Sequence, residues 1–206
     1  GCSGYPDNGN YALSFDGLSS WVDGFNNELL NIPGDITIEF DVLLSEVDVN
    51  DNLEVEIIMS YEGDGENPEV NTLYSIAVTP EGNLRWQHEY SNGENVILFS
   101  DISIRDNTLH NIIISRNADN QTIQFYDNKN LVNTFSYEAN ANGGDEGVFR
   151  FSYDEDSYDF SGSISQTKIY NLIYAEDGIQ EEGLISHWKF NAGEGTNLYD
   201  HSGNQN

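Results

Sequence analysis

The chain has 206 residues, of which 36 are Asp or Glu and only 7 are Lys or Arg, so its formal net charge at pH 7 is −29. This length fits one sizeable domain, or one domain with a fragment of a second. Binding to a nucleic-acid backbone or to an anionic lipid surface needs clustered cations, and so few Lys and Arg cannot supply them. We therefore exclude nucleic-acid partners and polybasic membrane binding.

The composition predicts a folded domain rather than an acidic disordered chain. Apolar residues make up 37% of the chain and aromatic residues 12%, which is enough to build a core. No stretch approaches the roughly 18 consecutive apolar residues of a membrane span, so we expect no direct membrane insertion. Cys2 is the only cysteine, which excludes an intramolecular disulfide and a zinc–thiolate site.

The first residues predict an N-terminal linker over residues 1–10. Within it, the pair Gly1-Cys2 precedes an acidic, Asn-rich chain and resembles the mature end of a bacterial lipoprotein, where the cysteine carries the lipid. The alternative is a thiol without function at an arbitrary boundary. The lipoprotein interpretation implies an extracellular or cell-surface location in a bacterium.

Apolar and polar residues alternate along most of the chain, which is typical of half-buried strands. This pattern places Glu39 and Asp41 on the outward side of one strand, and Glu54 and Glu56 on the outward side of the next. The predicted strands, in chain order, are Tyr11–Phe15, Ile36–Leu44, Leu53–Tyr61, Leu73–Thr79, Asn83–Tyr90, Asn95–Phe99, His110–Arg116, Gln121–Tyr126, Leu131–Tyr137, Val148–Tyr153, Gly162–Tyr170 and Leu184–Phe190.

Turn-forming residues separate these segments, as in Asp127-Asn128-Lys129-Asn130. No long segment shows the 3.6-residue period of an amphipathic helix. Many short strands at regular spacing predict an all-β fold, either a sandwich or a barrel. Two antiparallel sheets packed face to face would bury the apolar faces and leave the acidic faces in water.

Four segments, taken in order, resemble the LamG-like (laminin G, concanavalin A-like) jelly-roll family of bacterial extracellular proteins. They are YALSFDGLSSWVDG at residues 11–24, ITIEFDVLL at 36–44, LHNIIISRNADNQTIQFYDNKNLV at 109–132 and FSGSISQTKIYNLIY at 160–174. The resemblance implies a concanavalin A-like jelly-roll sandwich of two antiparallel sheets, which we assign to residues 11–190.

The chain departs from the family pattern at several positions. Leu109 stands where Trp is usual, and Asn128 stands where Gly is usual; Asn tolerates the left-handed conformation that Gly supplies. Ser165 and Gln166 replace an acidic pair, so a metal role of that pair elsewhere in the family is not carried over.

The last segment, GLISHWKFNAGEGTNLYDHSGNQN at residues 183–206, resembles a stretch that commonly starts a further LamG-like unit or decorates the end of one. We therefore expect residues 191–206 to be a C-terminal tail, or the start of a further unit. The resemblance implies a monomeric module within a longer surface or secreted protein.

The resemblance also implies a calcium ion, because LamG-like and related jelly rolls often hold Ca²⁺ where the first strand ends beside its late partner. The implied ligands are Asp16, Gly17 and Asp159, with Asp200 as a further oxygen donor. The alternative is that Asp16 caps a turn and Asp159 is solvated.

Carbohydrate-binding surfaces of jelly rolls combine aromatic platforms with side chains that hydrogen-bond sugar hydroxyls. The alternation with Leu84 favours a core position for Trp86. Trp21 and Trp188 match apolar positions of the family, which predicts packing for both. The strong negative charge favours neutral sugars, or anionic sugars bridged by calcium. The candidate ligand-binding residues are Tyr61, Arg85, Trp86, Arg150, Tyr153 and Tyr158.

A concanavalin A-like glycoside hydrolase or polysaccharide lyase is the alternative from another class. Hydrolysis needs two carboxylates roughly 5–9.5 Å apart, and the nearest match to an E-x-D-x-x-E motif is Glu46, Asp48 and Asp51, followed by the pair Glu54 and Glu56. In so acidic a chain such matches arise by chance. The sequence therefore predicts a non-catalytic extracellular module that binds glycan or another surface ligand; a spacer domain without ligand is the third alternative.

Overall fold

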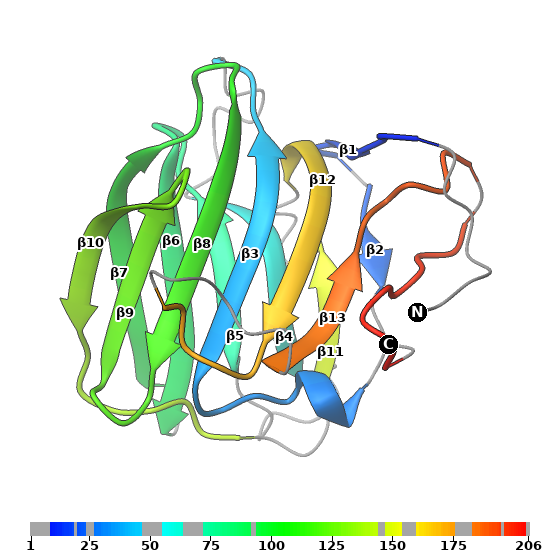
Figure 1. Cartoon of the computed structure of the whole chain (residues 1–206). Coiled ribbons are helices and arrows are strands. Elements are labelled where there is room, and N and C mark those ends of the chain that lie inside the picture. The colour runs from blue at the N-terminus through cyan, green and yellow to red at the C-terminus, as the bar shows by residue number, and fades with distance from the viewer. Residues whose placement is uncertain are drawn as a thin grey trace.

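The alternating segments form strands that pair into two antiparallel sheets, and the sheets pack face to face as a sandwich (Figure 1). This computed structural model describes residues 9–18, 20–23, 27–46, 55–63, 72–91, 94–143, 147–153, 160–175, 183–194 and 196–204. Within these residues there is no α-helix, and η1 (Glu28–Leu30) is a short 3₁₀ helix. The predicted all-β jelly-roll sandwich is confirmed.

Within the described residues, one sheet has seven strands and the other has six. The seven-stranded sheet runs in the order β1 (Leu13–Asp16), β12 (Ser161–Tyr170), β3 (Ile36–Leu43), β8 (Leu109–Asn117), β9 (Thr122–Asp127), β10 (Asn130–Ser136), and β13 (Leu184–Trp188) pairs with β12. The six-stranded sheet runs in the order β2 (Val22–Asp23), β11 (Gly147–Phe151), β4 (Glu56–Gly63), β5 (Tyr74–Val78), β6 (Asn83–Ser91), β7 (Glu94–Ser103).

Most predicted strands lie within two residues of the observed ones at both ends. The exceptions are β4, which begins later than predicted, and β7, which continues to Ser103. The two-residue strand β2 was not predicted, because two residues are too few to show a period.

The core lies between the two sheets and is rich in aromatic rings. Trp86 and Trp188 are 0% and 1% exposed. Trp188 stacks on Phe149 with 5.0 Å between ring centroids, and Trp86 stacks on Tyr74 at 6.5 Å. Packing of Trp188 is therefore confirmed, and Trp86 is the core residue that its alternation with Leu84 allowed.

Arg116 of β8 is fully buried in this core, and it is held by backbone carbonyls. Its Nε, Nη1 and Nη2 donate to the carbonyl oxygens of Gly34, Leu73 and Ile32 at 2.9, 3.0 and 2.6 Å. The guanidinium lies 5.6 Å from the centroid of the Trp86 ring, a favourable cation–π geometry. Burial lowers the pKa of Arg116 to about 10, so it stays charged at neutral pH.

Glu56 corrects the prediction that this side chain points outward. It is 2% exposed; its Oε1 pairs with Nη2 of Arg105 at 2.6 Å, and its Oε2 accepts the backbone N–H of Ser161 at 2.8 Å. The reason is a β-bulge between Ile57 and Met59, which shifts the alternation of β4 by one residue.

The residues on either side of Glu56 show the same shift. Val55 and Ile57 pack with Ala77 in a small cluster that is separate from the main core. The acidic side chain between them therefore turns inward, toward the seven-stranded sheet. No helix in the described part of the chain is long and apolar enough to cross a membrane.

Candidate functional site

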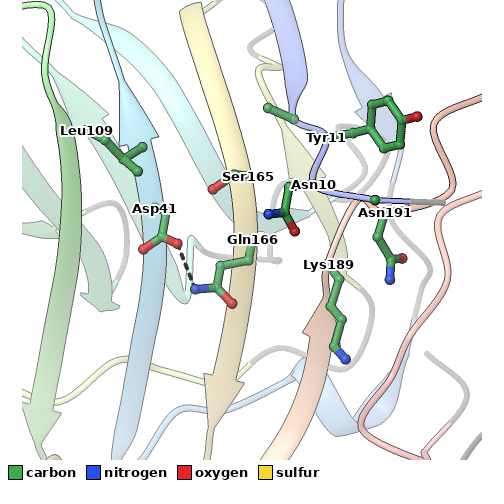
Figure 2. A pocket seen from close by; sticks show the side chains of 10 residues that line it. Asn10, Tyr11, Asp41, Leu109, Ser165, Gln166, Lys189 and Asn191 are labelled. Atoms are coloured by element: carbon green, nitrogen blue, oxygen red, sulfur yellow. Dashed lines mark hydrogen bonds between the residues drawn. The ribbon is translucent and has the colours of Figure 1, made fainter. Parts of the chain in front are cut away.

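A cavity of about 630 Å³ opens on the outer face of the seven-stranded sheet, where the N-terminal segment and the C-terminal strand lie against β12 (Figure 2). We call it the outer-face pocket. It is lined by Gly9, Asn10, Tyr11, Ala12, Asp41, Leu109, Ser165, Gln166, Lys189 and Asn191.

The polar centre of the outer-face pocket is Asp41 of β3. Its neighbours Phe40 and Val42 point into the core, so the alternation of the strand turns the carboxylate outward. Asp41 lies opposite Asn111 of β8 and Gln166 of β12 in the sheet register. Its Oδ1 accepts from Asn111 Nδ2 and its Oδ2 from Gln166 Nε2, both at 2.7 Å.

These two hydrogen bonds orient the Asp41 carboxylate but do not use all of its acceptor positions. A carboxylate offers about four acceptor positions, and the described residues occupy two of them at Asp41. Asn111 also donates to Glu39, two residues before Asp41 on β3, at 3.3 Å. Glu39 pairs in turn with Lys168 on the neighbouring strand β12 at 3.1 Å. The network thus holds Asp41 and Gln166 in place while both still face the cavity.

A second β-bulge presents two side chains side by side on β12. The register against β3 shifts between Ile164 and Gln166, with Ser165 as the extra residue. Both Ser165 and Gln166 line the pocket. These are the positions at which the chain departs from the acidic pair of the LamG-like pattern, and that departure was the sequence signal for a changed site.

The rim of the outer-face pocket is formed by the N-terminal segment and the residues after β13. Figure 2 shows Asn10 and Asp41 on either side of Gln166, with Lys189 extending below. Tyr11 is 46% exposed, and its ring lies over Gly193, where an added Cβ would come within 2.7 Å of a ring atom. Gly193 also has a φ of +76°, so glycine there permits both the backbone turn and the contact with Tyr11.

Two of the predicted ligand-binding residues lie in the core instead. Tyr61 and Trp86 are 1% and 0% exposed, so neither ring is presented to a ligand in this structure. Tyr61 was predicted at the end of a strand, beside a loop, but it lies within β4 and stacks on Tyr74 at 5.7 Å. Arg85 is half-buried on β6, opposite Ala77 and Phe99, in the sheet that does not carry the pocket.

Arg150 and Tyr153, two further ligand-binding candidates, contact each other and also Asp23 and Trp21. The Arg150 guanidinium carbon lies 4.5 Å from the Tyr153 ring centroid, and Arg150 Nε donates to Asp23 Oδ1 at 3.1 Å. Trp21 is 47% exposed and meets Tyr153 edge-on, with 5.3 Å between centroids. Its exposure corrects the prediction of packing. Tyr158 lies outside the described residues.

The implied calcium ligands do not form one group. Asp16 lies opposite Ser161, and the N–H of Gly17 donates to the carbonyl of Phe160 at 3.1 Å, so β1 ends beside β12 as expected. Asp200 forms an isolated antiparallel β-bridge with Trp188, at the end of β13.

The sheet register separates the two carboxylates. Trp188 lies opposite Thr167, six residues further along β12 than Ser161. Six residues of strand span roughly 20 Å, so Asp16 and Asp200 cannot share an ion. Asp159 lies outside the described residues.

Both aspartates also serve as turn caps. Asp16 Oδ1 accepts from the backbone N–H groups of Leu18 and Ser20 and from the Ser20 hydroxyl, at 2.7–3.2 Å. Asp200 accepts from the backbone of His187 and Ser202. In the described part of the chain no three His, Cys, Asp or Glu residues are grouped as metal ligands.

The carboxylates considered for hydrolysis are dispersed or engaged. Glu46 is exposed just past the end of β3, and Glu56 forms the buried pair with Arg105. Asp48, Asp51 and Glu54 lie outside the described residues.

Comparison with solved structures returns carbohydrate-binding and laminin G-like sandwiches. A candidate carbohydrate-binding protein from Bacteroides ovatus ATCC 8483 superposes with a TM-score of 0.66 at 14% identity, covering 95% of this chain and 56% of that one. The CBM40 of Ruminococcus gnavus IT-sialidase superposes with a TM-score of 0.60 at 15% identity, covering 82% of this chain and 96% of that one. Domains LG4-5 of the mouse laminin α1 chain give a TM-score of 0.57 at 9% identity, covering 85% and 46%.

At these identities the likeness shows the fold, and this chain spans little more than half of the Bacteroides ovatus protein. Among curated proteins none matches the chain. The Laminin_G_3 family model matches residues 16–180, which is most of the chain. The chain therefore belongs to the concanavalin A-like lectin/glucanases superfamily.

Proposed function

We propose that this protein is a carbohydrate-binding module and that it binds glycan in the outer-face pocket. The observation that carries the proposal is Asp41, a carboxylate fixed between Asn111 and Gln166 with acceptor positions left toward a cavity of about 630 Å³. Sugar hydroxyls are hydrogen-bond donors and acceptors, so an oriented carboxylate beside an amide suits a pair of neighbouring hydroxyls.

The rest of the pocket supports the same class of ligand. Tyr11 supplies an exposed ring at the rim, and Asn10 and Asn191 add further amides. The R. gnavus CBM40, of similar fold, has been solved bound to α2,3-sialyllactose. Because this chain carries a net charge of −29, we propose neutral glycans as its preferred ligands, with Lys189 as the cation that an acidic sugar would meet.

The test is binding to a broad glycan array, followed by calorimetry on the best neutral ligand with wild type and Asp41→Ala. We expect the substitution to weaken binding about tenfold or more, because hydrogen bonds to charged groups contribute roughly 1.5–3 kcal/mol. Gln166→Ala should weaken binding less, since it removes a neutral group.

The matched control is Asp101→Ala. Asp101 on β7 is likewise bonded to an amide, that of Asn133 at 2.8 Å, but it lies at the far edge of the sandwich. Its substitution should leave affinity unchanged. An array without any bound glycan would favour a spacer domain, and full affinity in Asp41→Ala would remove the pocket from the proposal.

We propose that the module is non-catalytic. The carboxylate pair with the clearest geometry, Glu39 and Asp41, is tied to Lys168, Asn111 and Gln166 on an open sheet face. The test is release of reducing ends from β-glucans and algal polysaccharides over a day at high protein concentration. Turnover that Asp41→Asn or Glu39→Gln abolishes would contradict this part of the proposal.

We also propose that a calcium ion binds near the end of β1. The support is the calcium ion that the family resemblance implies there, and the carboxylate oxygens of Asp16, which are donors that Ca²⁺ prefers. A ligand that binds only the native state raises stability by about 2.7 kcal/mol at a hundredfold excess over its dissociation constant. The melting temperature should therefore fall in EDTA, and Asp16→Ala should remove the difference. A melting temperature that does not respond to EDTA would overturn the calcium claim.

An extracellular or cell-surface location is the last part of the proposal. The family and the acidic surface support it, and Cys2, which lies outside the described residues, is the proposed lipid carrier. Expression of the full-length precursor with a radiolabelled fatty acid should label the wild type and leave Cys2→Ser unlabelled. Equal labelling of both proteins would exclude Cys2.

A further inference from the structure

An exposed aromatic group lies at the edge of the six-stranded sheet, away from the outer-face pocket. Trp21 immediately precedes β2, and Tyr153 follows β11 closely. The two strands pair through Asp23 with Arg150 and through Val22 with Phe151. This pairing brings together Trp21, Asp23, Arg150 and Tyr153, which we call the Trp21 cluster.

The members of the Trp21 cluster hold one another in place. Tyr153 lies between the indole of Trp21, edge-on at 5.3 Å, and the guanidinium of Arg150, at 4.5 Å from its centroid. Asp23 in turn fixes Arg150 through the Nε hydrogen bond of 3.1 Å. A ligand that stacked on the indole would therefore meet a ring whose orientation is already restricted, which lowers the entropy lost on binding.

The exposure of Trp21 stands out within this chain. The other two tryptophans are 0% and 1% exposed, whereas Trp21 is 47% exposed. Leaving a large aromatic surface in water forgoes the free energy that its burial would give. An aromatic platform that is exposed yet oriented by neighbours is typical of a binding surface rather than of the core.

The polar neighbours indicate what kind of ligand fits. Arg150 and Asp23 carry opposite charges, so the cluster has little net charge of its own. Among the described residues, Arg150 donates to Asp23 through Nε alone, and a guanidinium has five N–H donors. The Asp23 carboxylate is 55% exposed. The cluster thus combines an apolar face with donors and acceptors beside it, which matches a sugar ring with its C–H face and its hydroxyls.

We propose that the Trp21 cluster is a second carbohydrate-binding site, which takes a neutral pyranose stacked on Trp21, with hydroxyls bonded to Arg150 and Asp23. It rests on the proposed function in that both sites bind glycan, but it uses a different sheet and none of the residues that line the outer-face pocket. A polysaccharide that engages both sites would bind more tightly than either site alone allows.

The test uses the indole N–H signals in a ¹⁵N-edited NMR spectrum. The chain has three tryptophans, and Trp21→Phe identifies the Trp21 signal. Neutral hexasaccharides of glucose, mannose and xylose are titrated into the wild type and into Asp41→Ala. We expect the Trp21 signal to shift in both proteins with the same ligand, because the second site does not depend on Asp41.

Binding measurements then quantify the site. In the Asp41→Ala background, Trp21→Ala should weaken the remaining binding about tenfold, which corresponds to the upper range for an aromatic contact, and Trp21→Phe should retain part of it. Phe99→Ala is the control, because Phe99 is 52% exposed on another strand of the same sheet. Its substitution should change nothing.

The outcomes separate the two sites. If Asp41→Ala weakens binding and the Trp21 signal stays fixed at saturation, the second site is wrong and the outer-face pocket stands. If the Trp21 signal shifts while Asp41→Ala has full affinity, the pocket is wrong and the Trp21 cluster is the glycan site. A Trp21 shift that disappears in Asp41→Ala would show one continuous site and overturn the claim of a separate one.

Discussion

Glu56 and Asp41 are both strand carboxylates that accept hydrogen bonds from neighbouring strands or loops, but their surroundings differ. Glu56 is 2% exposed, and its partners are the Arg105 guanidinium and a backbone N–H. Asp41 is half-buried at the pocket, and its partners are the neutral amides of Asn111 and Gln166. The first carboxylate is paired with a cation inside the sandwich, whereas the second is bonded to neutral amides beside the cavity.

This difference separates a structural carboxylate from one that is available to a ligand. A buried charge needs an opposite charge and hydrogen-bond donors close by; Arg105 supplies the opposite charge to Glu56, and Ser161 supplies a backbone N–H. A carboxylate at the surface remains hydrated, so amides are enough to orient it. In a chain with 36 acidic and 7 basic residues, acidic content alone therefore says little about function, and the partners of each carboxylate decide it.

The largest expected effect is on stability and comes from Glu56→Ala. The substitution leaves the Arg105 charge buried without its carboxylate, which costs about 3–5 kcal/mol. Asp41→Ala should cost less, about 1–2 kcal/mol, because it removes two part-buried hydrogen bonds to neutral amides and leaves no buried charge without its partner. Urea unfolding of both variants measures the difference.

The double variant Glu56→Leu/Arg105→Met is the control for this prediction. It removes both charges together and should recover most of the stability lost in Glu56→Ala. If Glu56→Ala and Asp41→Ala lower the free energy of unfolding equally, the distinction between a structural and an available carboxylate is wrong.

Two histidines whose pKa values shift in opposite directions extend the comparison to the pH dependence of stability. His88 is buried, accepts from Trp86 Nε1 at 2.9 Å and contacts the Ala139 carbonyl at 2.9 Å. Burial lowers the pKa of His88 to about 4, although the bond to Ala139 opposes this shift. Between about pH 6.5 and pH 4 the unfolded chain therefore binds a proton that the native state does not.

Stability from His88 is consequently complete above its unfolded pKa of about 6.5 and is lost as the pH falls toward 4. The full loss is about 3 kcal/mol, at roughly 1.4 kcal/mol for each pKa unit. Urea unfolding from pH 7.5 to 4.5 should show this fall, and His88→Gln should flatten it while lowering stability at pH 7.5.

His110 of β8, which contacts Asp106 and Asp127, should behave in the opposite way. Burial acts to lower the pKa of His110, but its hydrogen bonds to Asp127 and Asp106 outweigh burial and raise it. Its contribution is therefore present below about pH 6.5 and lost as the pH rises through the raised value, so His110→Asn should steepen the acid fall. A pH profile that His88→Gln leaves unchanged would contradict the interior assignment.

The sequence predicted the strands well because each depends on a local period of two residues. It did not predict the bulges at Ile57/Met59 and at Ile164/Gln166, because an extra residue is visible only against its partner strand. The first bulge turned Glu56 inward, and the second placed Ser165 and Gln166 in the pocket. The wrong orientation predicted for Glu56 thus has a physical cause that no single strand reveals.

The candidate sites were only partly predictable for the same reason. Arg150 and Tyr153 were chosen as candidates for their chemistry, but Trp21 was assigned to packing from an apolar position in the family pattern. The outer-face pocket joins Asn10, Asp41 and Gln166, which are far apart in the chain and meet through strand pairing. No local pattern contains that information, whereas the turn at residues 127–130 was predictable because it is local.

The smallest expected effect concerns that turn. Asn128 and Lys129 connect β9 to β10 with φ of 49° and 66°, so both central residues are left-handed, as in a type I′ hairpin turn. Asn128 suits this conformation, as predicted, and its Nδ2 bonds to Asp127 at 2.9 Å. Lys129 is exposed, and lysine lacks the short polar side chain with which Asn tolerates the left-handed conformation.

Lys129→Gly should therefore stabilise the protein by roughly 0.5–1 kcal/mol, the left-handed strain removed less the extra chain entropy of glycine. Asn128→Gly should give no gain, because it removes the hydrogen bond to Asp127. Lys129→Ala is the control, since alanine loses the same charge but keeps the strain. Equal urea midpoints for Lys129→Gly and Lys129→Ala would mean that the backbone conformation of this turn contributes nothing measurable to stability.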